Sequence, residues 1–131
     1  MADSGALIVG IVGSRRRDSQ EDYIKVKDVL IVTLVKYGVS AVRLVSGGCP
    51  RGADRFAEMI AKGLGLPITI YYPDWKRYGR AAGFARNTEI ARNAQVLIAC
   101  VAPDREGGTE DTIKKFKRFH PDCDQQLIIV G

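Results

Sequence analysis

Five short apolar runs recur along the chain, and each is continuous rather than alternating. The runs cover residues 6–12, 42–45, 68–72, 96–101 and 127–130. Continuous apolar runs are typical of strands that are buried on both faces of a sheet, whereas alternation is typical of a sheet with one face in water. The pattern therefore predicts five strands of a parallel sheet.

The segments between these runs carry apolar residues at helical spacing. Helices are expected at residues 23–37, 56–64, 81–93 and 111–119. Gly38 and Gly65 follow the first two segments, where a helix is expected to end. Because strand and helix alternate to the end of the chain, we expect an α/β fold of three layers, with helices on both faces of the sheet.

Length and composition agree with one ordinary globular domain. The chain has 131 residues, of which 46% are apolar and 27% are charged. These values argue against a disordered chain, a collagen-like fibre and a coiled coil, and they favour a single domain over residues 1–131. No apolar run reaches the roughly 18 to 20 residues that span a bilayer, and residues 1–5 contain no basic residue. We therefore expect a cytoplasmic protein with no secretory signal and no membrane association.

The cysteine and histidine residues do not form a recognisable reactive or metal-binding pattern. Cys49, Cys100 and Cys123 show no Cys-x-x-Cys spacing, and His120 is the single histidine. One histidine is too few for a His-based metal site or for a Ser–His or Cys–His catalytic pair. We expect no metal site, no cofactor, and structural or incidental cysteines in a reducing compartment.

Three of the five expected strands end in glycine, small hydroxyl or arginine residues. In a parallel α/β sheet, ligands bind beyond the carboxyl ends of the strands, where the strand order reverses. Glycine lets the backbone approach a ligand closely, and free amides at the start of a helix favour phosphate or carboxylate. The residues expected to bind the ligand are Gly13, Ser14 and Arg15 after the first strand, Ser46, Gly47, Gly48, Gly52 and Asp54 after the second, and Gly107, Gly108, Thr109 and Thr112 after the fourth.

A tight connection between strand and helix is the alternative explanation for any one of these turns. Three such turns at one edge of the sheet together favour a binding site. The chain contains neither Gly-x-x-x-x-Gly-Lys-Ser/Thr nor Gly-x-Gly-x-x-Gly. A P-loop nucleotidase and a standard dinucleotide dehydrogenase are therefore disfavoured.

Two further pairs of residues lie where they could face the same ligand. Arg86 and Asn87, on the helix before the fourth strand, could direct their donors at it, although a solvated helix face is the alternative. Asp74 and Trp75 follow the third strand, where an aromatic ring could stack on a base or lie half-buried in a loop.

Taken together, these motifs resemble the SLOG superfamily, which joins DprA-like DNA-processing proteins to LOG-type phosphoribohydrolases. The similarity is greatest to the small stand-alone YspA-like branch and covers nearly the whole chain, from about residue 7 to residue 130. It is carried by Gly13-Ser14-Arg15, Val45-Ser46-Gly47-Gly48 with Arg51-Gly52-Ala53-Asp54, Arg86-Asn87 and Gly108-Thr109. The resemblance implies a Rossmann-like sheet of order 3-2-1-4-5 and a nucleotide or nucleotide-derived ligand over the strand ends.

The chain departs from the pattern of the LOG-type enzymes at two positions that bear on catalysis. Arg86 matches the enzymes' arginine, but Asn87 stands at their lysine and Thr112 at their glutamate. Glu110 and Asp111 lie one or two positions earlier, and Asp54 on the second helix is the other candidate. A carboxylate is the natural group to stabilise a ribosyl cation or to activate water. The resemblance therefore implies that the protein binds or senses a nucleotide without turnover.

Two other functions stay open. One is hydrolysis of the N-glycosidic bond of nucleoside monophosphates, with Arg86, Asp54 and Asp111 as the catalytic candidates. The other is DprA-like nucleic-acid binding, suggested by the net charge of +5. The basic residues available for nucleic acid are Lys76, Arg77, Arg80, Arg86 and Arg92. Because relatives of this fold often dimerise, we expect a homo-oligomer.

Overall fold

The computed structural model describes residues 6–38 and 41–131, so the expectation that residues 1–5 hold no secretory signal lies outside the described residues. The strands are β1 (Leu7–Gly13), β2 (Val42–Ser46), β3 (Ile68–Ile70), β4 (Val96–Cys100) and β5 (Leu127–Val130). The helices are α1 (Gln20–Tyr37), α2 (Ala53–Leu64), α3 (Trp75–Tyr78), α4 (Ala82–Asn93) and α5 (Gly108–Phe119), with the 3-10 helix η1 (Gly79–Ala81) between α3 and α4.

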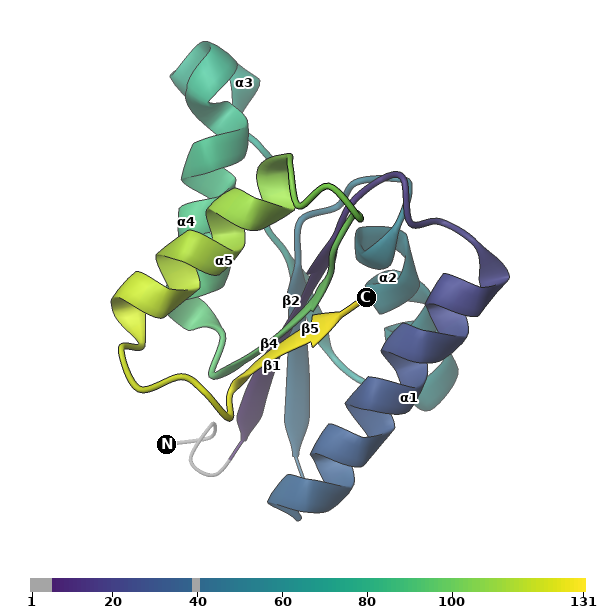
Figure 1. Ribbon diagram of the computed structural model, residues 1–131. Coiled ribbons are helices and arrows are strands. Elements are labelled where there is room, and N and C mark those ends of the chain that lie inside the picture. The colour runs from purple at the N-terminus through teal and green to yellow at the C-terminus, as the bar shows by residue number, and fades with distance from the viewer. Residues whose placement is uncertain (1–5, 39–40) are drawn as a thin grey trace.

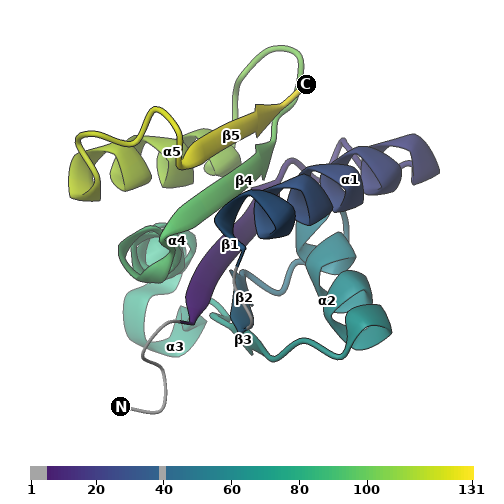
Figure 2. The same ribbon diagram turned by 90° about the horizontal axis from the view of Figure 1, so that it is seen from below.

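All five strands are parallel and lie in the order β3-β2-β1-β4-β5, which Figure 2 shows from below. This arrangement confirms the predicted parallel sheet and the order 3-2-1-4-5. Gly10 of β1 is paired with Val45 of β2 on one side and with Leu97 of β4 on the other. The chain therefore builds outward from β1 in one direction and then returns to its other side, which places the switch point of the sheet between β1 and β4.

Helices cover both faces of the sheet and complete the expected Rossmann-like three-layer fold. Helices α1 and α2 pack on one face, and α4 and α5 pack on the other (Figure 1). The strand residues alternate between these two layers, so both faces of β1 and β4 are buried, as the continuous apolar runs predicted. Among the large buried side chains are Val9, Ile11, Leu44, Phe56 and Ile98 on the α1–α2 side, and Val45, Ile90, Leu97 and Phe116 on the α4–α5 side.

Several helices and strands differ from their predicted bounds, and the differences are local. Helix α1 begins at Gln20 because Ser19 and Asp22 form a capping box with each other's backbone N–H groups. Strand β3 ends at Ile70, so the two residues after it, predicted as strand, leave the sheet. A short helix and the 3-10 turn occupy residues 75–81, just before and at the start of the helix expected over 81–93, where the pattern indicated no separate element.

Helix α5 begins three residues before its predicted start, and this shift matters for the candidate site. Gly108 and Thr109 form its first turn, and Gly107 is its N-cap. Glycine-rich segments are typical of loops, so local pattern alone does not reveal that they begin a helix. The glycines thus contribute the backbone N–H groups of a helix N-terminus rather than those of a loop.

No helix within the described ranges is long and apolar enough to cross a membrane.

Candidate functional site

A cavity of about 300 Å³ lies over the switch point between β1 and β4. Its walls are the loop after β1, the middle of α4 and the first turn of α5, with the β2–α2 loop and α2 at its base. The lining residues are Val12, Gly13, Ser14, Arg15, Arg16, Cys49, Asp54, Arg86, Asn87, Ile90, Glu106, Gly107, Gly108, Thr109 and Thr112. The structure thus brings together ten of the sixteen residues predicted to bind the ligand.

The amino terminus of α5 borders this cavity through Gly107, Gly108 and Thr109. The first N–H groups of a helix have no carbonyl partner inside the helix, and together they carry a partial positive charge. No side chain in the described part of the protein caps α5. Its free amide groups are therefore available to an anion in the cavity.

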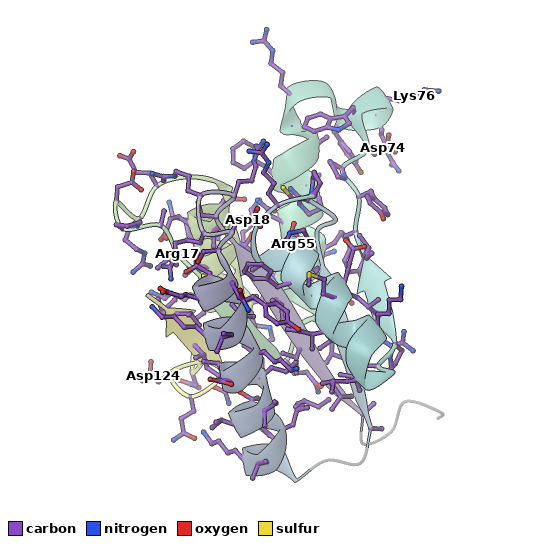
Figure 3. All side chains as sticks on the ribbon, turned by 90° about the vertical axis from the view of Figure 1, so that its right-hand side faces the viewer. Arg17, Asp18, Arg55, Asp74, Lys76 and Asp124 are labelled. Carbon is purple, nitrogen blue, oxygen red and sulfur yellow. The ribbon has the colours of Figure 1, made fainter. Side chains whose placement is uncertain are left out.

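The amino terminus of α2 lies at the same edge of the sheet, and the N–H of its N-cap residue, Gly52, is already bonded. The carboxylate of Asp18 accepts a hydrogen bond from the N–H of Gly52 at 2.7 Å. It also forms an ion pair with Arg55 at 2.9 Å; Figure 3 labels both side chains. The hydrogen bond from Gly52, together with Arg55, lowers the pKa of Asp18. Gly52, a predicted ligand-binding residue, therefore bonds to a carboxylate of the protein itself. Sequence analysis did not single out Asp18, although its place immediately before the Ser19 cap was a signal.

The three consecutive arginines after β1 have different roles. Arg16 donates two hydrogen bonds to Asp104, at 2.8 and 2.7 Å, which lower the pKa of that carboxyl group. Arg17 is half-buried and bonds to Asp22 and to the carbonyl oxygen of Val101. Arg15 is exposed, lines the cavity and makes no ion pair with a described residue. Of the three, Arg15 is therefore the cation available to a ligand.

Arg86 and Asn87 face the cavity rather than solvent and connect its walls. Arg86 donates one hydrogen bond to the carbonyl oxygen of Gly47 and another, at 2.9 Å, to the side-chain oxygen of Asn87. Asn87 is 6% exposed, and its amide nitrogen lies 3.2 Å from both the Gly108 carbonyl oxygen and the Asp111 carboxylate. This chain of hydrogen bonds runs from the β2–α2 loop across α4 to α5. It holds the cavity walls in place.

Asp54 lies at the base of the cavity and is 7% exposed. One carboxyl oxygen accepts a hydrogen bond from the N–H of Cys49, and the other lies 3.1 Å from the hydroxyl oxygen of Ser46. That hydroxyl has a single proton, and its shorter contact, 2.6 Å, is to the carbonyl oxygen of Ile11, which can only accept. A proton on Asp54 therefore completes the contact with Ser46. Burial favours the same protonated form, because it raises the pKa of Asp54 despite the Cys49 N–H and the nearby charge of Arg86.

The remaining candidates on α5 are held by partners or face away. Thr112 lines the cavity, and its buried hydroxyl lies 3.4 Å from the carbonyl oxygen of Gly108. Asp111 forms an ion pair with Lys115 at 2.9 Å, and Glu110 pairs outside the cavity with Arg105. Sequence analysis missed Glu106, an exposed carboxylate at the cavity rim. Its position two residues before a Gly-Thr turn could have indicated it.

Asp74 and Trp75 lie outside this cavity. The Asp74 carboxylate caps α3 by accepting a hydrogen bond from the N–H of Arg77. Trp75 is 61% exposed and does not line this cavity. Figure 3 shows Asp74 and Lys76 on α3, apart from Asp18 and Arg55.

The basic residues considered for nucleic acid differ in exposure and in the partners that they already have. Lys76, Arg77 and Arg80 are exposed on the segment of α3 and η1. Arg86 bonds to the β2–α2 loop, and Arg92 pairs with Glu89 on its own helix. Lys76, Arg77 and Arg80 are therefore the members of this set that form no ion pair with a described residue and bond to no other loop.

Histidine, cysteine and carboxylate residues form no group of three or more that could hold a metal ion anywhere in residues 6–38 and 41–131. The three cysteines are free thiols, two of them buried.

Comparison of the chain with models of protein families, with curated proteins and with solved structures found no match. The resemblance to the SLOG superfamily therefore stays a prediction from the motifs. A function for this protein has to be argued from the fold and the cavity.

Proposed function

We propose that this protein binds a nucleotide or a nucleotide-derived phosphate ligand in the cavity between β1 and β4, without turning it over. One observation carries the proposal: the uncapped amino terminus of α5 and the unpaired Arg15 border the same cavity. The cavity also lies at the switch point of the sheet, where open α/β folds bind their ligands.

A phosphate group fits the chemistry of these walls. The amides of the first turn of α5 can donate to an anion, and Arg15, from the loop after β1, can add a charge-assisted hydrogen bond. The volume of about 300 Å³ suits a small molecule rather than a polymer. The resemblance to the SLOG superfamily supports a nucleotide as the source of that phosphate.

The carboxylates around the cavity favour binding over hydrolysis. Cleavage of an N-glycosidic bond needs a carboxylate that is fixed beside the sugar and free to act. Asp54 uses both oxygens on Ser46 and Cys49, and Asp111 is paired with Lys115. Glu106 is exposed on the rim, and its carboxylate makes no hydrogen bond to a described residue that would hold it in one orientation.

The proposal is tested by thermal unfolding with a panel of nucleoside monophosphates and the matching nucleosides. Each monophosphate that binds is expected to raise the melting temperature, and its nucleoside is expected to raise it far less. For one site, ligand at 100 times its dissociation constant adds about 2.7 kcal/mol to the free energy of unfolding. The absence of a shift with every nucleotide at millimolar concentration would contradict the proposal.

A further inference from the structure

A second cavity, of about 310 Å³, lies beside the first and is lined by three tyrosines. Tyr71 and Tyr72 come from the segment that leaves the sheet after β3, and Tyr78 ends α3. The floor is one face of α4, formed by small residues and by Arg86. None of these three rings lines the phosphate cavity. Aromatic rings around a cavity favour a flat, aromatic ligand that can stack on them.

The two cavities share a wall. Arg86 lines both, and its guanidinium is tied to Gly47 in the β2–α2 loop. The ring of Tyr72 packs over Gly48, the next residue, so closely that a Cβ atom there would lie 2.5 Å from the ring. The Arg86 guanidinium therefore lies between the tyrosine cavity and the phosphate site, and a ligand that extends past it would contact both.

The chemistry of the tyrosine cavity suits a flat ring with an amino group. Aromatic side chains stack on the faces of nucleobases, and this contact tolerates any base. The carboxylates of Asp74 and Glu89 also line the cavity. One oxygen of each is bonded, to the N–H of Arg77 and to Arg92 respectively, and the other oxygen makes no hydrogen bond to a described residue, so it can accept one from a ligand. An exocyclic amino group donates hydrogen bonds, whereas a ring carbonyl oxygen at that position accepts them. The lining thus favours a base such as adenine over one such as hypoxanthine.

We propose that the tyrosine cavity binds the base of the same ligand whose phosphate lies at the amino terminus of α5, and that it selects a base with an exocyclic amino group. This inference rests on the proposed function, because it assigns the second half of that ligand. Arg86 faces the part of the ligand that joins base and phosphate.

Isothermal titration calorimetry with three compounds tests the inference: adenosine monophosphate, inosine monophosphate and ribose 5-phosphate, which lacks a base. Adenosine monophosphate is expected to bind about tenfold more tightly than ribose 5-phosphate, the size expected for one stacked base. Inosine monophosphate is expected to bind more weakly than adenosine monophosphate, because it presents a carbonyl oxygen to Asp74 and Glu89.

Tyr78→Leu is expected to lower the affinity for adenosine monophosphate to that for ribose 5-phosphate, while the affinity for ribose 5-phosphate stays unchanged. Tyr78 is 45% exposed, so the fold does not depend on it, and Tyr78→Phe, which keeps the ring, is expected to retain the advantage. Phe84→Leu is the matched control, since Phe84 is an exposed aromatic on α4 that lines neither cavity.

The outcomes separate this inference from the proposed function. Equal affinity for adenosine monophosphate and ribose 5-phosphate would overturn the base site and leave the phosphate site standing. The base site would also be overturned if Trp75→Leu, rather than Tyr78→Leu, removed the tighter binding of adenosine monophosphate over ribose 5-phosphate. If adenosine, titrated as a fourth compound, bound as tightly as adenosine monophosphate and Tyr78→Leu abolished its binding, the base site would be supported and the phosphate site overturned. Binding of none of these compounds would overturn both, and equal binding of inosine monophosphate would overturn the selectivity for an amino group.

Discussion

Arg86 on α4 donates a hydrogen bond to the carbonyl oxygen of Gly47, a residue 39 positions earlier in the chain. The contact leaves no room for a side chain on the acceptor residue: a Cβ atom on Gly47 would lie 2.5 Å from the guanidinium and 2.8 Å from the Asp54 carboxylate. The glycine therefore permits the close approach of α4 to the β2–α2 loop. That approach forms the wall between the two cavities.

Gly48→Ala is expected to destabilise the protein by about 1–3 kcal/mol. Gly48 has a φ of +77°, which a residue with a Cβ atom rarely adopts, and the added atom would also meet the ring of Tyr72. Urea denaturation measures the change in the free energy of unfolding. Gly63→Ala is the control, because Gly63 lies in α2 with open space around it and alanine favours the helix. A similar loss for both variants would contradict the conformational explanation.

Arg15→Gln is expected to weaken binding of a nucleoside monophosphate about fivefold, the size expected for an exposed charge-assisted contact. Arg16→Gln is expected to have a smaller effect on affinity, because the Arg16 guanidinium already donates two hydrogen bonds to Asp104. Calorimetric titration of both variants with the same ligand makes the comparison. A larger loss for Arg16→Gln would show that the wrong arginine has been assigned to the phosphate.

Asp54→Asn is expected to gain stability relative to the unmodified protein as the pH rises from 3.8 toward neutrality. Burial raises the pKa of Asp54 above its ordinary value of 3.8, although hydrogen bonds and the charge of Arg86 oppose this. An acid with a raised pKa in the folded state adds stability below its unfolded pKa, and that contribution is lost as the pH rises through the folded pKa. Asparagine stays neutral throughout. Urea denaturation at several pH values measures the difference.

Asp22→Asn provides a control of opposite sign. Burial alone would raise the pKa of Asp22, but hydrogen bonds from Arg17 and Ser19 outweigh it and lower the pKa below 3.8. The stability from such a group is present above 3.8 and is lost as the pH falls through the folded pKa. This variant should be less stable than the unmodified protein at neutral pH, by a margin that shrinks in acid. The same pH trend in both variants would refute the assignment for Asp54.

Incubation of the protein with adenosine monophosphate is expected to release no measurable adenine, as followed by chromatography. The hydroxyl of Thr112 is a poor base near neutral pH, and Asp54 and Asp111 are engaged by other residues. A missing general acid–base group costs roughly 10² to 10⁴ in rate. Rapid release of adenine would contradict binding without turnover. The loss of that activity in Glu106→Gln, Asp54→Asn or Asp111→Asn would then identify the carboxylate responsible.

The amino-acid sequence by itself determined the architecture of this protein, because burial on both faces of a strand leaves a local record. The continuous apolar run that became β1 and the helical spacing that became α2 could each be interpreted without any distant contact. Glycine and hydroxyl residues at the strand ends marked the edge of the sheet where the cavity lies. The order of the strands came from the resemblance rather than from the pattern, since local periodicity does not say which strands are neighbours.

Only the tertiary structure decided which of the marked residues are free to meet a ligand. Among the described residues Arg15 has no ion-pair partner, whereas Arg16 is bonded to Asp104, 88 positions away. Similarly, the N–H of the N-cap of α2 is bonded to Asp18, whereas no described side chain caps α5. Each of these outcomes depends on a partner brought close by the fold. A one-dimensional pattern shows the donors and acceptors, whereas the packing of α4, α5 and the loops decides which of them are already bonded to each other.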